Sequence, residues 1–422
     1  MSGQFAFEAL TFKNYRKNRT IVSSDCESIL QDIDQELPVP LQLHRYPTGY
    51  DVATWSVPPA WNVKEAWVKG PDGRVVASYD EHPLFLAPYS TPFSGVVSKQ
   101  ELMKHVRFHP KREEDFYYEH RYAYDFRNRL SDWVITMPRQ RFDALPEGAY
   151  EVHLDIEISD GEMLVGEWVL PGNSTRCVVL LADYCHPGQV NDSWTGILAM
   201  IQVMRRLADL PDRRYTYRLL VLPETIGSCI HLAANDALLE QTDLAIFSEF
   251  VGWGRNWKIL AGERNDRLAM DLAEIGTHID SEFTAAGLYE GYGNDEIIFD
   301  YAGVPALSVQ MAECDEYHSS SDHPDLIEQG NIDKAADMIF HLTGIMEKNR
   351  NYRFAHKVPV YLTRYELYSD AVLERSKFRQ NREIINGIND GLKPVEIWRK
   401  TGIPFEEICE FIERLEQKNL IA

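Results

Sequence analysis

The segment Cys185-His186-Pro187-Gly188-Gln189-Val190-Asn191-Asp192 places an imidazole and a carboxylate on one short loop. His186 follows an apolar run typical of a buried strand, and Asp192 stands just before a predicted helix. Because zinc accepts a histidine nitrogen and an aspartate oxygen at about 2.0–2.2 Å, this loop could hold a metal ion. A purely structural role is the alternative, in which His186 ends the strand and Asp192 caps the helix.

Three more polar side chains each follow a predicted strand. Glu224 could act as a general base toward a metal-bound water, or it could be a first-turn glutamate that the helix dipole favours. Glu249 is a further carboxylate after the next strand. His318 belongs to Tyr317-His318-Ser319-Ser320-Ser321-Asp322-His323, which could also be an ordinary polar loop.

The elements that must position these residues alternate along the chain. Continuous apolar runs predict strands, and amphipathic stretches predict helices. The strands are expected at 177–181, 219–222, 244–247 and 304–309, and the helices at 194–210, 226–239 and 332–348. This order predicts an α/β fold with a mostly parallel sheet and helices on both faces. Ligands bind at the carboxyl ends of such strands, so one pocket could collect all four candidates.

Two other regions of the chain differ from this α/β pattern in composition and in the elements they predict. Residues 46–145 are rich in aromatic residues and turn signals and are expected to form an inserted β-rich domain, with a hairpin around Pro71-Asp72-Gly73. A second hairpin over Glu151–Leu170 is expected to lead back out of it. Residues 1–45 and 146–358 would form the α/β domain. Residues 359–422 contain a predicted helix–turn–helix and are expected to form a winged-helix-like domain.

Composition narrows the classes of function. The 422 residues include 43 Lys and Arg against 65 Asp and Glu, a net charge of −22. This charge argues against nucleic acid and against an anionic membrane surface as partners, and it is compatible with a homo-oligomer. The near-neutral helix–turn–helix region favours protein contact or dimerisation over DNA. Without a signal peptide, a transmembrane run or a Cys-x-x-Cys pair, the expected location is cytoplasmic.

Taken together, the motifs resemble the zinc exopeptidases of the bacterial leucyl aminopeptidase and transferrin-receptor type. The resemblance includes Asn294–Phe299 followed by Ala302–Ala306, which is similar to the Ser-Asp-x-x-x-Phe…Gly-x-Pro-Ala segment of that family. A bacterial branch known as a domain of unknown function is more similar still. It resembles this chain in Cys-His-Pro-x-x-x-Asn-Asp, in Pro-Glu-Thr-Ile-Gly-Ser and in Pro47–Val63, and its members carry an inserted β-rich domain and a C-terminal winged helix.

The resemblance implies roles for the candidates. His186, Asp192 and His318 would be zinc ligands, with Asp192 bridging where two zincs are present, and Glu224 would be the general base. Glu249 stands where the family keeps a metal-binding Asp, so it could be a further ligand or could hold a substrate ammonium.

This chain departs from the family pattern in three ways. The short spacing between His186 and Asp192 follows the domain-of-unknown-function branch and not the well-studied enzymes. Thr225 stands where a second Glu is usual, and Gly188 stands where an Asp is common after the first metal histidine. A single zinc is therefore expected at least as readily as two.

Some neighbouring residues could support the ligands or contact the substrate. Asp322 could orient His318, while Trp194 could wall the pocket or pack in the core. Asp295 and Tyr317, which lie in the matching segments, complete this set.

The expected function is zinc-dependent, aminopeptidase-like hydrolysis of a small peptide or amide next to a free amino group. The inserted domain would restrict the site to short substrates. One alternative is a metal-dependent hydrolase or transferase acting on an amide of a secondary metabolite or of a sugar-linked amino acid. Another is a catalytically silent interaction or regulatory protein.

Overall fold

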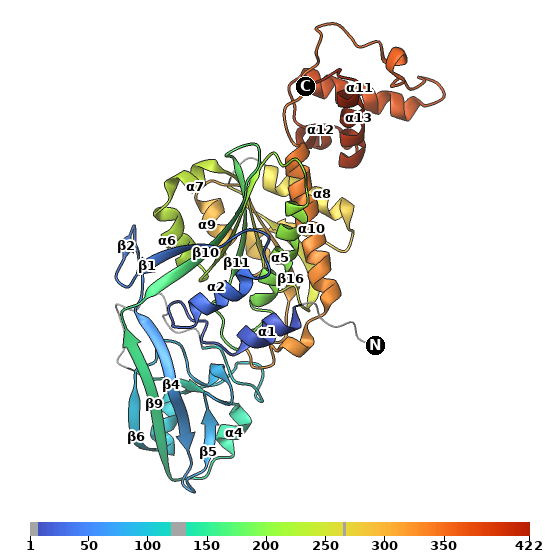
Figure 1. Cartoon of the computed structure of the whole chain (residues 1–422). Coiled ribbons are helices and arrows are strands. Elements are labelled where there is room, and N and C mark those ends of the chain that lie inside the picture. The colour runs from blue at the N-terminus through green and yellow to red at the C-terminus, as the bar shows by residue number, and fades with distance from the viewer. Residues whose placement is uncertain (1–6, 120–131, 265–266) are drawn as a thin grey trace.

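A computed structural model describes residues 7–119, 132–264 and 267–422 (Figure 1). Its centre is an eight-stranded sheet in the order β1-β10-β12-β11-β13-β16-β14-β15. The strands are β1 (Gln42–Pro47), β10 (Glu162–Leu170), β12 (Thr216–Leu222), β11 (Cys177–Asp183), β13 (Thr242–Ser248), β16 (Ala306–Glu313), β14 (Arg255–Ala261) and β15 (Thr284–Gly287). The four middle strands, β12, β11, β13 and β16, run parallel, so their carboxyl ends meet at one edge.

Helices cover both faces of this sheet (Figure 1). One face packs against α1 (Glu8–Tyr15), α2 (Cys26–Asp34), α5 (Trp194–Ala208), α8 (Leu268–Ile279) and α10 (Gln329–Lys348), and the other against α6 (Ile226–Ala233), α7 (Asp236–Gln241) and α9 (Asp295–Tyr301). Each face of the sheet carries its own apolar core, and alternate residues of β11 contribute to the two. Val178 and Leu180 pack in the core on one face, while Val179 and Leu181 pack in the core on the other. The predicted α/β class with a mostly parallel sheet is confirmed.

The apolar runs located the central elements and missed others. The four predicted strands exist as β11, β12, β13 and β16. The helix predicted over 226–239 is two helices, α6 and α7, separated at Ala234 and Asn235. Four elements between 255 and 301, namely β14, α8, β15 and α9, were not predicted.

A second, four-stranded sheet has the order β5-β4-β9-β6. Its strands are β5 (Val75–Ser78), β4 (Ala60–Lys69), β9 (Ala149–Ser159) and β6 (Phe93–Ser98). Around it lie β2 (Asp51–Val52), β3 (Trp55–Ser56), α3 (Lys99–His105), β7 (Val106–Arg107), β8 (Ile135–Thr136) and α4 (Arg139–Asp143). The predicted hairpin around Pro71-Asp72-Gly73 is confirmed, because β4 and β5 pair antiparallel.

The second predicted hairpin, over Glu151–Leu170, is wrong. Strand β9 pairs with β4 and β6, whereas β10 pairs with β1 and β12, so the turn at Asp160 joins two different sheets. Burial gives the physical reason. β9 alternates between buried and exposed residues and covers one side of a small core, while β10 is buried on both faces of the central sheet.

Three helices form the C-terminal part of the chain: α11 (Arg375–Asn389), α12 (Pro394–Thr401) and α13 (Phe405–Gln417). We call residues 359–422 the helical unit. The predicted helix–turn–helix is present as α12 and α13, but a strand pair that would form a wing has no counterpart within residues 359–422, all of which the structure describes.

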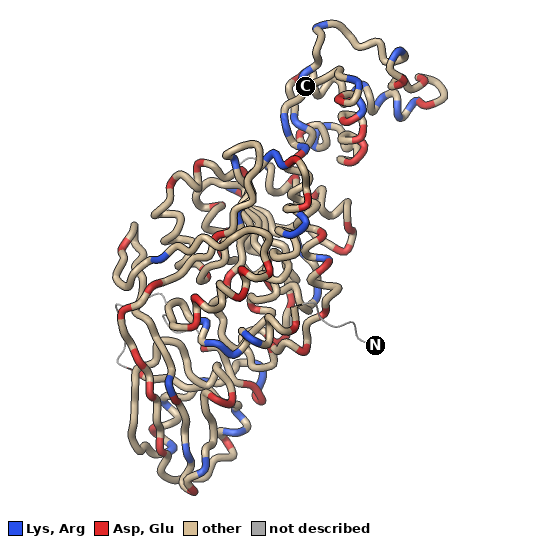
Figure 2. The backbone as a smooth tube through the Cα atoms, in the orientation of Figure 1, with Lys and Arg blue, Asp and Glu red and all other residues tan. Residues whose placement is uncertain are grey.

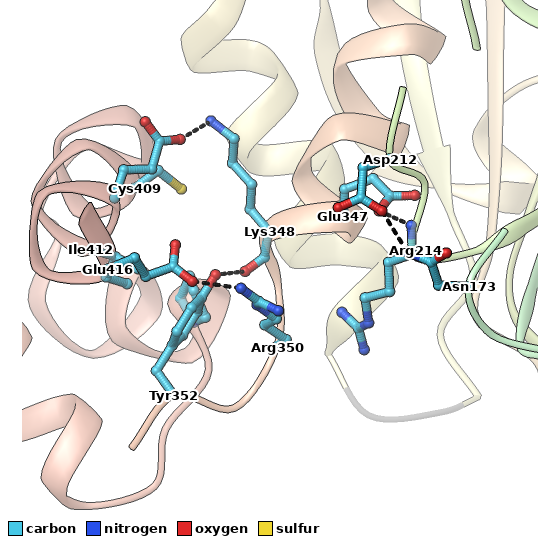
Figure 3. Close-up of a pocket in the computed structure, with 12 residues that line it drawn as sticks. Asn173, Asp212, Arg214, Glu347, Lys348, Arg350, Tyr352, Cys409, Ile412 and Glu416 are labelled. Atoms are coloured by element: carbon cyan, nitrogen blue, oxygen red, sulfur yellow. Dashed lines mark hydrogen bonds and ion pairs between the residues drawn. The ribbon is translucent and has the colours of Figure 1, made fainter. Parts of the chain in front are cut away.

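The helical unit lies at the end of the sheet opposite the second sheet (Figure 1). A cavity of about 570 Å³ separates it from the amino ends of β11 and β12, and Lys348 and Arg350 cross this gap to Glu413 and Glu416 (Figure 3). Among the described residues, no helix has the length and apolar character needed to cross a membrane.

Gly196 allows α5 to approach the end of β13. A Cβ atom at this position would lie 1.7 Å from the carbonyl oxygen of Ser248, a distance that no relaxation of a side chain can relieve. Gly344, in α10, is a matched helical glycine whose added Cβ would meet no heavy atom within 4 Å.

Gly196→Ala should therefore destabilise the protein by about 1–3 kcal/mol or more through overpacking. Gly344→Ala should stabilise it by up to about 1 kcal/mol, because alanine is the better helix former. Thermal unfolding, monitored by circular dichroism, measures the change in stability of both variants. Equal midpoints for the two variants would contradict this packing.

Candidate active site

The carboxyl ends of the parallel strands bring three predicted ligands together. His186 follows β11, Asp192 lies just before α5, and His318 lies in the loop after β16. One ligand atom from each of the three lies within 4.8 Å of the others. His318 Nε2 is 3.2 Å from Asp192 Oδ2, and His186 Nδ1 is 3.5 Å from Asp192 Oδ1.

His186 lies between two carboxylates. Its Nδ1 is 3.2 Å from Oδ1 of Asp183, the last residue of β11, and its Nε2 is 3.2 Å from Oε2 of Glu224. The Ser193 hydroxyl donates to Asp183 and helps to fix that carboxylate. Burial by itself would lower the pKa of His186, but Asp192 and the other negative groups around it hold that pKa well above its ordinary value.

Negative charge is in excess at this edge. Burial raises the pKa of Asp183, and burial together with Asp183 and Asp192 raises the pKa of Glu249 well above its usual range. Asp192 differs, because burial raises its pKa but His186 and His318 lower it further.

The donor set fits a divalent cation. Two imidazoles and one carboxylate are ligand types that zinc accepts, and three protein ligands leave a fourth position open. Asp192 Oδ2 is buried and faces the His318 ring nitrogen at 3.2 Å, so a cation between them could bind both groups.

The loop that carries Asp192 is held by buried groups. Asp322 accepts hydrogen bonds from the backbone N–H groups of Val190 (2.8 Å), Asn191 (2.8 Å) and Asp192 (3.1 Å). The expectation that Asp322 orients His318 is therefore corrected, since its carboxylate is engaged by this loop instead. Arg19, which is fully buried, donates to backbone carbonyls on the same loop, including that of His186.

Glu224 stands at the end of β12. Its side chain is 20% exposed, which leaves it accessible to solvent. Thr225, which follows it, has a positive φ of 61° and donates its backbone N–H to Asp295 Oδ1 at 2.9 Å. Asp295 therefore fixes the turn that aims Glu224, because a non-glycine residue in this conformation needs support from its surroundings.

Glu249 lies at the end of β13 and is fully buried. Asn294 Nδ2 donates to its Oε2 at 3.2 Å. Within the described residues, Glu249 does not join the group in which the ligand atoms of His186, Asp192 and His318 converge. It is a separate acidic group beside them.

The two aromatic candidates have different surroundings. Trp194 is 1% exposed and its indole N–H donates to the Thr11 hydroxyl at 3.1 Å, so it packs in the core and does not wall the pocket. Tyr317 stacks on His318 with ring centroids 3.8 Å apart and is partly exposed. Phe250 and Tyr292 lie 5.7 and 5.0 Å from the Tyr317 ring and extend this aromatic wall.

A segment between the strands of the second sheet contacts the loop of the third ligand directly. Tyr118 donates its backbone N–H to the carbonyl of His318 at 2.8 Å, and its ring lies 5.0 Å from the His318 ring. His318 has a positive φ of 57°, so this hydrogen bond supports an unfavourable backbone conformation. Asp115 accepts from the hydroxyls of Ser320 and Ser321 and also pairs with Arg112. We call residues 112–118 the clamp segment.

Comparison with known proteins identifies the family. Residues 8–349 match the family described as Domain of unknown function (DUF4910). This chain is a DUF4910 protein. It is 27% identical over 323 residues to a protein of Clostridium acetobutylicum, covering 74% of this chain and 72% of the relative, which is named as a candidate polysaccharide biosynthesis protein with an aminopeptidase-like domain.

Solved structures share the fold of the DUF4910 protein. The structure of a candidate peptidase from Clostridium acetobutylicum has a TM-score of 0.85 at 23% identity, covering 99% of this chain and 95% of that one. A zinc aminopeptidase from Bacillus subtilis has a TM-score of 0.58 at 12% identity, covering 81% of this chain and 94% of that one. An aminopeptidase from Aneurinibacillus has a TM-score of 0.52 at 12% identity, covering 81% and 93%. The fold is therefore the peptidase-like one.

Several residues of this DUF4910 site were not found from the sequence. Asp183 had one usable signal, because it ends a buried strand three residues before a candidate ligand. Arg19, Asp115 and Tyr118 are distant from the motifs in the chain, and nothing in their local sequence marks them.

Asp115→Ala should loosen the His318 loop, because it removes the acceptor for Ser320, Ser321 and Arg112. We expect zinc affinity to fall by about 10–100-fold, as is common when a group that supports a metal ligand is lost. Competition with a chromophoric chelator measures the affinity. Asp143→Ala is the control in the same region, because Asp143 forms an exposed pair with Arg139. Unchanged affinity in a folded Asp115→Ala protein would contradict the role of the clamp segment.

Proposed function

We propose that this DUF4910 protein is a metal-dependent hydrolase that cleaves a peptide or amide bond next to a free amino group. The observation that carries the proposal is the convergence of His186, Asp192 and His318 at one sheet edge, with Glu224 3.2 Å from His186. The aminopeptidase-like name of the Clostridium acetobutylicum relative and the fold shared with zinc aminopeptidases support it.

His186, Asp192 and His318 would hold one zinc ion. A zinc ion bound there would supply a Lewis acid for the scissile carbonyl and would lower the pKa of water. Thr225, in place of the usual second Glu, favours a single ion over two. Asp183 Oδ1 lies 3.2 Å from His186 Nδ1, so with the proton on Nδ1 the opposite ring nitrogen, Nε2, would be free to bind the metal on the side of Glu224.

Glu224 would move the proton. Its carboxylate would take a proton from the attacking water and return it to the leaving amine as the bond breaks. Its partial exposure suits this role, because it must reach both water and substrate. Asp295 would act through the backbone of Thr225 as a positioning residue for Glu224.

Glu249 would hold the free amino group of the substrate. It is buried among Asp183, Asp192 and Glu296, so a substrate ammonium would be attracted to this part of the site. Asn294 keeps the carboxylate in place by donating to Oε2. Such a group would give the enzyme a preference for unblocked substrates.

A second candidate function keeps the same chemistry and changes the substrate. The Clostridium acetobutylicum relative is named for polysaccharide biosynthesis as well as for an aminopeptidase-like domain. This name favours an amide of a sugar-linked amino acid as the alternative substrate.

A substrate panel with one active-site variant tests the proposal. Aminoacyl amides and dipeptides with free amino groups should be cleaved, and the N-acetylated forms should not. Glu224→Gln should lose about 10²–10⁴-fold in kcat because it removes the general base. Glu282→Gln, a change at an exposed side chain, should leave kcat unchanged.

Full activity in Glu224→Gln would contradict the assignment of the base. Equal cleavage of free and acetylated substrates would contradict the aminopeptidase-like reaction. Cleavage confined to sugar-linked amides would favour the alternative substrate.

A further inference from the structure

The first turns of α11, in the helical unit, are strongly basic, although the protein as a whole is acidic. Helix α11 carries Arg375, Lys377, Arg379 and Arg382 within its first eight residues, and all four are exposed. None of them forms an ion pair with any described acidic residue. The whole chain has a net charge of −22, so this concentration of positive charge is unusual in it.

Helix α13 presents the opposite charge. Glu413 and Glu416 pair with Lys348 and Arg350 across the cavity that separates the helical unit from the α/β sheet (Figure 3). Glu406, Glu407 and Glu410 are exposed and have no basic partner among the described residues. The unit therefore carries both signs of charge (Figure 2), with basic residues concentrated at the start of α11 and acidic residues along α13.

Exposed apolar side chains gather just before α11. Of the thirteen large apolar side chains that are exposed in the described part of the chain, five lie between residues 358 and 373. Val372 and Leu373, directly before the basic helix start, are 83% and 86% exposed. Exposed apolar groups that gather beside charged ones are typical of an interaction surface.

The helical unit is far from the candidate active site. Asn173, Asp212 and Arg214 line the cavity beside the unit and precede β11 and β12, so the unit lies at the amino edge of the parallel strands. His186, Glu224 and Glu249 follow the carboxyl ends of those strands. A partner bound to the helical unit would therefore leave the active site open.

We propose that two copies of this chain associate through their helical units, with α11 of one copy facing α13 of the other. In a two-fold symmetric dimer each such contact is made twice, and Val372 and Leu373 would be covered at the interface. Charge complementarity argues for a second copy over other partners. The acidic residues of α13 and the net charge would repel a nucleic acid or an anionic membrane.

Charge reversal on each helix, followed by mixing, tests the proposal on the full chain. The wild type should sediment as a dimer of the 48.6 kDa chain. Arg375→Glu with Arg379→Glu, and Glu406→Lys with Glu410→Lys, should each be monomeric because like charges then face each other. An equimolar mixture of the two variants should regain the dimer. The control is the double variant Arg74→Glu with Lys111→Glu. It should remain dimeric, because both side chains are exposed and lie far from the helical unit.

Three results would overturn the proposal. The first is a wild-type monomer at tens of micromolar, and the second is a dimer that withstands both reversals. The third is a mixture of the two variants that stays monomeric. Circular dichroism of each variant verifies that the helices are intact. The test does not depend on the proposed hydrolase activity, so the two can fail separately.

Discussion

Buried negative charge at the carboxyl edge of the parallel sheet is the constraint on which the rest of the site depends. Asp183, Asp192, Glu249, Asp295 and Glu296 are all buried there. Unpaired buried carboxylates are costly, and a group in this position either gains a cation or becomes protonated. His186 and His318 offset only part of the charge, so the edge is suited to a bound metal and a cationic substrate group.

The surrounding structure keeps the ligands in place. Asp322 and Arg19 hold the loop of His186 and Asp192 from two sides, through backbone N–H groups and carbonyls respectively. The clamp segment, which lies between the strands of the second sheet, holds the backbone of His318. The clamp segment therefore takes part in building the site. Removing this segment would release the loop that carries His318.

The central fold and the main candidates could be predicted from the sequence because their signals are local. Strands buried on both faces are continuous apolar runs, and polar residues directly after them must lie at one edge. The hairpin over Glu151–Leu170 failed because the sequence at a turn does not tell which sheet each flanking strand will join. Asp115, Arg19 and the true contacts of Asp322 depend on long-range packing. For Trp194 the sequence favoured the core slightly over a pocket wall, and its burial agrees with the core.

Metal content per chain tests the central claim most directly. The protein is purified without chelators or a metal-binding tag, and bound metal is counted by mass spectrometry for the wild type, His186→Ala and the control His323→Ala, which changes an exposed histidine near His318. The account predicts about one zinc per chain in the wild type and the control, and its loss in His186→Ala. A wild type that stays free of metal after zinc is added back, or a His186→Ala protein that keeps its metal, would contradict it.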